Sequence, residues 1–407
     1  MLRIALEQAK PGQKLARTLY YHYGTVMLAA GTPLTRPHID KLREFGYLTL
    51  YIYDEDTEDI AALDLIDDAT RARVGGKVRR LFEDLRKDTV SLFSAEDLVK
   101  SSQDDIRRKL STGAIAKSVA RDFIPSAFIE DVDKILENLL AERDVCLSVG
   151  TLKSMQTFLY DHSLEVTLKA LLVGRHFGMS KAQLRTLGLG SLLHDIGYLF
   201  LPEDLVHRSG QASLTPQEKA TLQRHTMLGY CLLREQKALS VATAHVAYQH
   251  HERQDGQGYP RGLSGTNRIP SGRAALRDAP GVIHRFAAIV AVANVHDNLV
   301  SARPGHTPLP EDEAVLVLRK AAGTDLNQEA VDAYLSFIPV FPVGTPVVVR
   351  DGRFKGYRGV VVKVFPSDLE QPLVRMIYKG GAKLPKPFTV DLREELWPIR
   401  AVPIGEE

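Results

Sequence analysis

The chain has 407 residues, more than one hydrophobic core usually organises, so we expect two or three domains. Hydrophobic residues make up 44% and charged residues 25%, the balance of a folded globular protein and not of a disordered or disulfide-rich one. The 52 basic and 50 acidic residues leave a formal net charge of +2, which is too small to make the whole chain a nucleic-acid binder. Any basic partner surface must therefore be local.

Two features bear on location. Cys146 and Cys231 are the only cysteines, and each lies among apolar neighbours, so we expect neither a disulfide framework nor a cysteine-based zinc site. The N-terminus has no charged leader followed by an apolar core, and no apolar run approaches the ~18 residues that a membrane span needs. We expect a cytoplasmic protein with no membrane span.

The first 126 residues divide into two parts. Residues 1–57 predict a small α+β domain, with a strand over 48–53 and a helix that begins after Thr35, a good N-cap. Residues 58–126 carry leucines spaced among many charged residues and predict a helical connector.

The rest of the chain divides into a part with a helical pattern and a part with a β-strand pattern. Over residues 127–340, apolar residues recur at three- and four-residue spacing and predict an all-α domain, with two helix starts signalled at Ser180 and Thr215. Residues 341–407 contain β-branched runs separated by Gly, Pro and Asp and predict a small β-barrel-like domain. The expected fold is therefore multidomain, with a helical centre flanked by a small α+β domain and a small β domain.

Histidine is concentrated in the helical part. Eleven of the 13 histidines lie between positions 162 and 306, where an even distribution would place about five. An adjacent His-Asp pair near a helix end can reach two metal ions, with one carboxylate oxygen on each. One further histidine lies on the inward face of a predicted helix beside Leu222, and a double histidine ends another. The candidate ligands are His162, His194, Asp195, His225, His250 and His251.

These residue types indicate a metal and a reaction. Imidazoles with few carboxylates suit Fe, Mn, Zn or Ni, whereas Mg or Ca would ask for an oxygen-rich cage. Six candidate ligands exceed what one tetrahedral zinc uses. Two ions about 3.5–4 Å apart activate a water molecule and clamp the oxygens of a phosphodiester during in-line attack. Phosphodiester hydrolysis is therefore the leading chemistry.

The motifs resemble a known family. The sequence LHDIG at 193–197, then His225, then HHERQDGQGYPRGL at 250–263 resembles the HD-GYP family of bacterial cyclic di-GMP phosphodiesterases, over about residues 145–340. The resemblance implies an all-helical HD-superfamily core with a metal centre that cleaves cyclic di-GMP to linear pGpG and onward to GMP. It implies that the six candidate ligands bind metal, that His194 and Asp195 are catalytic, and that the substrate contacts are Gly258, Tyr259, Pro260 and Arg303.

The chain departs from the family pattern at a metal ligand. Where the family has a ligand Asp, this chain has Asn294, so a neutral amide oxygen replaces a charge and metal affinity should fall. Asp297, one turn further on the same helix face, is a candidate substitute. Phe158 stands where members with three metals carry Glu. We therefore expect two divalent transition-metal ions at most, Fe or Mn first and Zn or Ni as alternatives.

A second departure concerns the substrate phosphate. The lysine that follows HDIG in the family is Tyr198 here, which removes a cation. Residues 271–281 form an insertion that is either a tolerated surface loop or a source of a replacement cation, Arg273 or Arg277.

The flanking parts add candidate partners. The N-terminal part looks like the small domain that often precedes the HD-GYP module, and the C-terminal part resembles both the β-rich tail of such proteins and a KOW motif. Residues 341–386 hold nine basic against three acidic residues. Nucleic-acid binding is nevertheless disfavoured, because basic residues on a small barrel usually form its solvated face. The expected partners are cyclic di-GMP and a diguanylate cyclase (GGDEF) domain protein, and a homodimer stays open.

Two functions compete. The first is a metal-dependent cyclic di-GMP phosphodiesterase. The second is a catalytically weak or inactive receptor or scaffold that binds cyclic di-GMP or a protein partner. Asn294 and Tyr198 favour the receptor, whereas six intact ligand positions favour the enzyme. Another phosphate ester, including another cyclic dinucleotide, is the remaining alternative.

Overall fold

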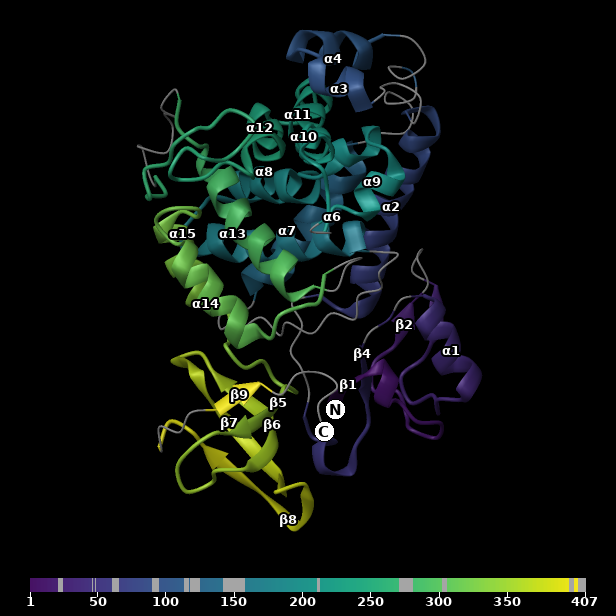
Figure 1. Ribbon diagram of the computed structural model, residues 1–407, viewed down its shortest axis with the longest axis vertical. Coiled ribbons are helices and arrows are strands. Elements are labelled where there is room, and N and C mark those ends of the chain that lie inside the picture. The colour runs from purple at the N-terminus through teal and green to yellow at the C-terminus, as the bar shows by residue number, and fades with distance from the viewer. Residues whose placement is uncertain are drawn as a thin grey trace.

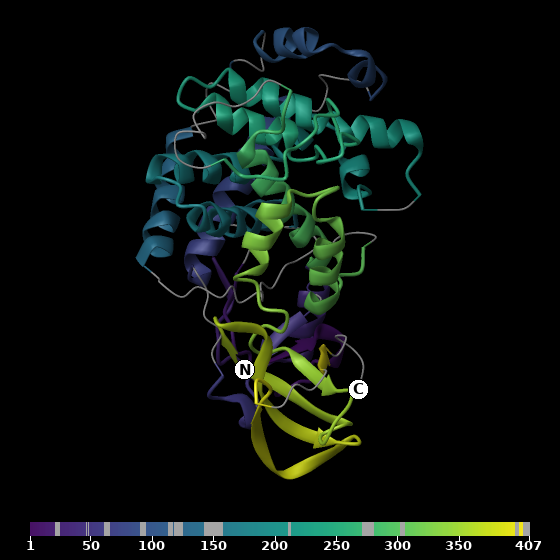
Figure 2. The same ribbon diagram turned by 90° about the vertical axis from the view of Figure 1, so that its left-hand side faces the viewer.

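A helical body lies above two small β-containing units in the computed structural model (Figure 1). The structure describes residues 1–20, 25–45, 47, 49–60, 66–89, 95–112, 117, 125–141, 158–210, 213–270, 281–301, 306–394 and 399–401. The N-terminal and C-terminal units lie at the same end of the helical body in both views (Figures 1 and 2).

The helical body shares one large apolar core that includes side chains from α2 to α15. Its central helices α7 and α8 pack on each other, α13 packs on α7 and α12 packs on α8, while α11 packs on α12 and η3. The helices are α2 (Asp68–Thr89), α3 (Ala95–Lys100), α4 (Gln103–Leu110), α6 (Pro125–Ala141), α7 (Phe158–His176), α8 (Lys181–Leu192), η3 (Ile196–Phe200), α9 (Glu203–His207), α10 (Pro216–Gln223), α11 (His225–Arg234), α12 (Val241–Gln249), α13 (Arg285–Val300), α14 (Glu311–Ala321) and α15 (Gln328–Leu335).

The helix starts predicted from capping residues are confirmed. Thr35, Ser180 and Thr215 each accept a hydrogen bond from the backbone N–H three residues later, and the residue at that position bonds back to the cap. One prediction is wrong. Leu222 and His225 do not share a helix, because α10 ends at Gln223 and α11 begins at His225. His225 is nevertheless fully buried.

The N-terminal unit is built from two strand pairs and one helix. Strand β1 (Leu2–Ala5) pairs antiparallel with β4 (Thr49–Ile52), and β2 (Leu19–Tyr20) pairs with β3 (Val26–Leu28). Helix α1 (Arg36–Glu44) buries Ile39 and Leu42 in a separate small core.

The C-terminal unit is one antiparallel sheet. Its strands are β5 (Pro346–Val349), β6 (Tyr357–Phe365), β7 (Asp368–Lys379), β8 (Ala382–Asp391) and β9 (Ile399–Ala401), in the order β8-β7-β6-β5-β9. The prediction of β structure is confirmed. Barrel closure is not, because β8 and β9 are opposite edges of an open sheet among the described residues.

The two terminal units contact each other. Ile60 packs with Val360 and Ile377 of the C-terminal sheet. Beside this apolar contact, the Arg375 guanidinium donates to both oxygens of Asp59, at 2.6 and 2.7 Å. Within the described residues, no helix combines the length and apolar character needed to cross a bilayer.

Candidate metal centre

Asp195 lies at the centre of a ring of imidazoles. Its Oδ2 is 3.2 Å from Nε2 of His194 and 3.7 Å from Nε2 of His162. Its Oδ1 is 3.5 Å from Nε2 of both His225 and His250. The two oxygens of one carboxylate therefore face two different pairs of imidazoles, which is the geometry expected of a carboxylate that bridges two ions.

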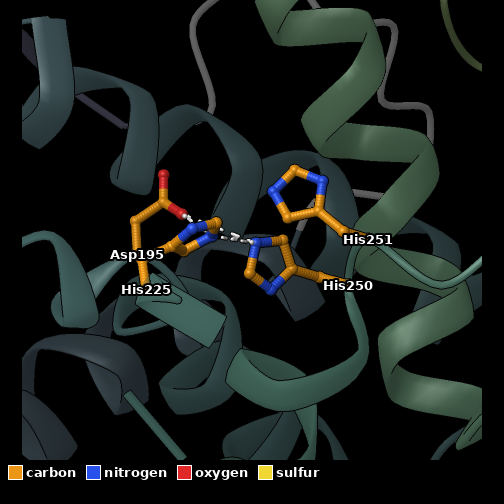
Figure 3. Close-up of side chains that lie close together, drawn as sticks. All are labelled: Asp195, His225, His250 and His251. Atoms are coloured by element: carbon orange, nitrogen blue, oxygen red, sulfur yellow. Dashed lines mark hydrogen bonds and ion pairs between the residues drawn. The ribbon is translucent and has the colours of Figure 1, made fainter. Parts of the chain in front are cut away.

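The potential ligand atoms form two groups that share Asp195. One group contains Asp195, His162 and His194, and the other contains Asp195, His225, His250 and His251. Within each group the potential ligand atoms lie within 4.8 Å of one another. Figure 3 shows the second group, with the His225 ring between Asp195 and His250. The structure thus brings together all six residues that the sequence singled out.

Three of these imidazoles are oriented by helix ends. Each holds its Nδ1 against a backbone carbonyl in the last turn of a helix, where carbonyls lack the partner that a continuing helix would supply. An Nδ1–H donated to a carbonyl leaves the Nε2 lone pair free for a metal. The pairs are His194 with Ser191 at 2.6 Å, His225 with Leu222 at 2.7 Å, and His250 with Ala247 at 3.0 Å.

His162 is oriented differently. It lies inside α7, where backbone carbonyls are used by helical hydrogen bonds, and its Nδ1 lies 2.7 Å from Oδ2 of Asp297 on α13. Because an ionised carboxylate only accepts hydrogen bonds, His162 must donate from Nδ1, and its Nε2 faces Asp195 with a lone pair.

Asp297 belongs to a buried chain of charges. The Lys169 ammonium donates to Oδ1 of Asp297 at 2.7 Å and lies 4.0 Å from Oε2 of Glu165. Glu165 in turn accepts from the Arg71 guanidinium on α2. Burial disfavours the charged form of Lys169, but Asp297 and Glu165 together outweigh it and raise the Lys169 pKa above its usual value. The pair is therefore ionised although its side chains are 1% and 0% exposed.

The protonation states suit a cation at the centre. Burial lowers the pKa of His225 to about 4 and also lowers the pKa values of His162, His250 and His251, so these imidazoles are neutral near pH 7. Burial alone would raise the pKa of Asp195, but the surrounding imidazoles outweigh it and hold that pKa well below its usual value. The Asp195 carboxylate is therefore ionised.

His194 is the exception among the imidazoles. Burial again lowers its pKa, but the carboxylate of Asp195 outweighs burial and raises it. Nε2 of His194 is buried and makes no well-aligned hydrogen bond to the described residues. The space between His194 and Asp195 thus favours positive charge, and neutral imidazoles around one carboxylate are a donor set that fits a divalent transition metal. This cluster is able to hold metal.

Gly197 allows η3 to pack closely against α11. A Cβ at Gly197 would collide with the backbone carbonyl of His225 and would crowd the backbone nitrogen of Gly229. Because Gly197 has no Cβ, η3 packs directly on the start of α11, which brings His225 to Asp195.

The Gly258-Tyr259-Pro260 loop lies against the second group of ligands. The Tyr259 ring stacks on His251, with centroids 4.7 Å apart and an interplanar angle of 18°. Its backbone N–H donates to the carbonyl of His251 at 3.2 Å. Gly258 packs so closely on the backbone of residues 251–253 that a Cβ there would collide with it. Glu252 holds the far side of the loop by accepting from the N–H groups of Arg261 and Leu263.

Tyr198, at the position where a lysine was expected, stacks on His225. The ring centroids are 4.2 Å apart and the rings are 10° from parallel. Arg303, Arg273 and Arg277 lie outside the described residues, so the predicted cationic contacts to a substrate phosphate stay predictions.

Asn294 is buried on α13, and its Oδ1 accepts a hydrogen bond from Asn298 at 2.7 Å. Asp297, weighed above as a substitute ligand, instead contacts His162, Lys169 and Ser301. Both oxygens of Asp297 are therefore engaged by neighbouring side chains, one of which is the candidate ligand His162.

Sequence reasoning missed Lys169 and Glu165. Both lie on the face of α7 that carries His162, Glu165 three residues after it and Lys169 seven residues after it. Two charged residues among the leucines and valines of this helix were the available signal, because buried charges need partners.

Comparisons with known proteins agree with the motifs. Residues 134–274 match the HD domain family. A cyclic di-GMP phosphodiesterase of Pseudomonas aeruginosa is 29% identical over 259 residues, which cover 64% of this chain and 57% of that protein. A cyclic di-GMP phosphodiesterase of Thermotoga maritima is 33% identical over 40% of each chain. A 3'3'-cGAMP-specific phosphodiesterase of Vibrio cholerae is 31% identical over 42% of this chain and 36% of its own length.

These matches confirm the resemblance to the HD-GYP family that the motifs indicated. The chain spans less than two thirds of the length of each of these curated relatives.

Proposed function

We propose that this chain, in which residues 134–274 belong to the HD domain family, is a metal-dependent phosphodiesterase that hydrolyses cyclic di-GMP to linear pGpG, GMP or both. The observation that carries the proposal is the arrangement of four imidazole Nε2 atoms in two pairs around the two oxygens of Asp195. The names of the similar proteins support the substrate class.

The proposed cofactor is a pair of divalent transition-metal ions, Fe or Mn first and Zn or Ni as alternatives. Asp195 would bridge them. His162, His194 and the neutral oxygen of Asn294 would serve one ion, and His225, His250 and His251 the other. When bound, such ions supply Lewis-acid activation of the phosphodiester and of the attacking water.

The chain's own residues would do the rest. The four imidazoles with lowered pKa values and the ionised Asp195 offer lone pairs to a metal, and the helix-end carbonyls hold three rings in place. Tyr259, Gly258 and Pro260 would hold the nucleotide beside His251, with Arg303 on a phosphate. We propose a cytoplasmic location and a diguanylate cyclase (GGDEF) protein as regulatory partner, with a homodimer as one assembly to test.

A receptor is the second candidate. Asn294 lacks the charge that a ligand carboxylate would add, and the stacked Tyr198 occupies the place of a cation. Both features reduce the charge available for catalysis while leaving the loop of Tyr259 for binding. A similar protein named as 3'3'-cGAMP-specific adds another cyclic dinucleotide to the substrates to be tried.

The test combines metal content with turnover. The full chain is purified without oxygen, its metals are measured by elemental analysis, and cyclic di-GMP and 3'3'-cGAMP are each followed by separating the linear dinucleotide from the mononucleotide. We expect close to two ions per chain and product from cyclic di-GMP, and neither from His194→Ala. Nucleotide binding with no product, even after loading with Fe or Mn, would favour the receptor.

A further inference from the structure

One candidate ligand of the proposed metal centre contacts a carboxylate far away in the sequence. His194, His225 and His250 each use a carbonyl within four residues of their own position, whereas His162 uses a carboxylate from another helix. An Asp side chain without further contacts can adopt several rotamers. The orientation of His162 therefore depends on what holds Asp297.

Lys169 holds Asp297 from the opposite side. Its ammonium donates to Oδ1 while Oδ2 accepts from His162, so the two oxygens of Asp297 have separate tasks. Ser301 donates to Oδ2 at 3.2 Å. These contacts fix both the position of the carboxylate and the plane in which it lies.

The cation is itself held in place. Lys169 is 1% exposed, and a buried ammonium is costly unless it is paired and hydrogen-bonded. Glu165, one helical turn earlier, supplies a second negative charge, and Arg71 on α2 pairs with Glu165. The charges therefore alternate from α2 to His162 without a break.

We propose that Lys169 is a positioning residue for the metal centre: through Asp297 it fixes the proton of His162 on Nδ1 and so presents Nε2 to the ion beside Asp195. The inference rests on the proposed function and deepens it. It also explains why Asp297 cannot replace a ligand carboxylate at Asn294, since both its oxygens already serve Lys169 and His162.

The first test measures Mn²⁺ alone. Metal-free full-length protein, its Lys169→Met variant and a control are titrated with Mn²⁺, and both binding affinities are determined by calorimetry with chelator competition. In Lys169→Met we expect one ion to bind 10- to 100-fold more weakly, the usual cost of losing a partner of a ligand, and the other to change less than about twofold. The control is Lys77→Met. It removes a cation that lies 2.8 Å from the buried carboxylate of Asp131, which is not part of the ligand cluster, and it should leave both Mn²⁺ affinities unchanged.

A second variant separates positioning from stability. Lys169→Met with Asp297→Asn removes both buried charges and keeps the packing, so it should recover most of the thermal stability that Lys169→Met loses. Its Mn²⁺ affinity should stay low, because an amide can donate to Nδ1 and favour the wrong tautomer of His162. Recovery of both stability and affinity would mean that the pair serves only the fold, and the inference would be wrong.

A third readout needs no metal. Nitrogen NMR of metal-free protein distinguishes the two tautomers of a histidine, and we expect His162 to carry its proton on Nδ1 in the wild type and to show a mixture in Lys169→Met. An unchanged tautomer with unchanged Mn²⁺ affinities would overturn the inference. If the wild type bound no divalent metal at all, the proposed function would fall, and the tautomer measurement would still decide whether Lys169 positions His162.

Discussion

His162 differs from the other imidazoles of the centre in how it is held. His194, His225 and His250 take their orientation from helix ends a few residues away, so the sequence that forms the helix also aims the ring. His162 takes its orientation from Asp297, 135 residues later in the chain, and Asp297 is held in turn by a buried ion pair with Lys169. The difference separates three rings that are oriented by nearby backbone from one ring that needs α7 and α13 to pack correctly.

The largest effect should come from Asp195, which the two groups of candidate ligands share. Asp195→Asn removes the charge that faces both pairs of imidazoles, so both ions should be lost and turnover should fall by about 1000-fold or more. Elemental analysis and turnover on the same preparation check this. Retention of one ion on His225, His250 and His251 would show that the two groups of ligands bind metal independently and that Asp195 does not link them.

The next effect should be confined to the group of candidate ligands that includes His162 and His194. Asn294→Asp adds a carboxylate next to a proposed cation, so we expect the weaker ion to bind about tenfold more tightly and turnover to rise. Asn267→Asp is the control, since it adds the same charge at a residue whose side chain contacts Gly323 and Gln328 and none of the candidate ligands. Unchanged metal affinity in Asn294→Asp would sink the account of this position.

The contrast between contacts within a few residues and contacts between distant helices explains what the sequence could predict. The helix starts at Ser180 and Thr215 depend on residues three apart, and the structure confirms them. The break between α10 and α11 was missed because apolar spacing continues across two helices that follow each other without a loop. The sequence predicted where helices begin, but it did not predict where α10 ends and α11 starts.

The role of Asp297 could not be read in the same way. Its position three residues after Asn294 places both on one helix face, which allowed a ligand role. Its contacts with His162 and Lys169 come from α7, far away in the chain. Only the packing of α13 on α7 decides between a ligand and a partner of a ligand.

His251 offers a third case, in which an aromatic ring lies against the imidazole. Because Tyr259 stacks on His251, removing the ring tests whether the loop orients a ligand or binds substrate. We expect Tyr259→Ala to weaken cyclic di-GMP binding by about tenfold, the scale of one lost base stack, with metal content unchanged. Equilibrium dialysis with labelled nucleotide and elemental analysis check both. Loss of one ion would place Tyr259 with Asp297, among the residues that hold a ligand.

The smallest effect concerns an exposed counterpart of the Lys169–Asp297 pair. Asp59 is 67% exposed and joins the two terminal units through Arg375, whose hydrogen bonds lower its pKa to about 2. As the pH falls, Asp59 takes up a proton near pH 4 in the unfolded chain and only near pH 2 in the folded chain. The ion pair therefore stabilises the fold above about pH 4, and its contribution is lost as the pH falls toward 2. We expect Asp59→Asn to cost about 0.2–1 kcal/mol in urea unfolding at pH 6 and almost nothing near pH 2.5. A loss of stability that does not depend on pH would mean that Asp59 acts by packing. The control is Asp40→Asn, which disrupts an exposed ion pair within α1 and should leave the contact between the two terminal units intact. The comparison with Lys169→Met would then measure directly how much burial adds to the same pairing of a cation with a carboxylate, because water screens Asp59 and is excluded from Asp297.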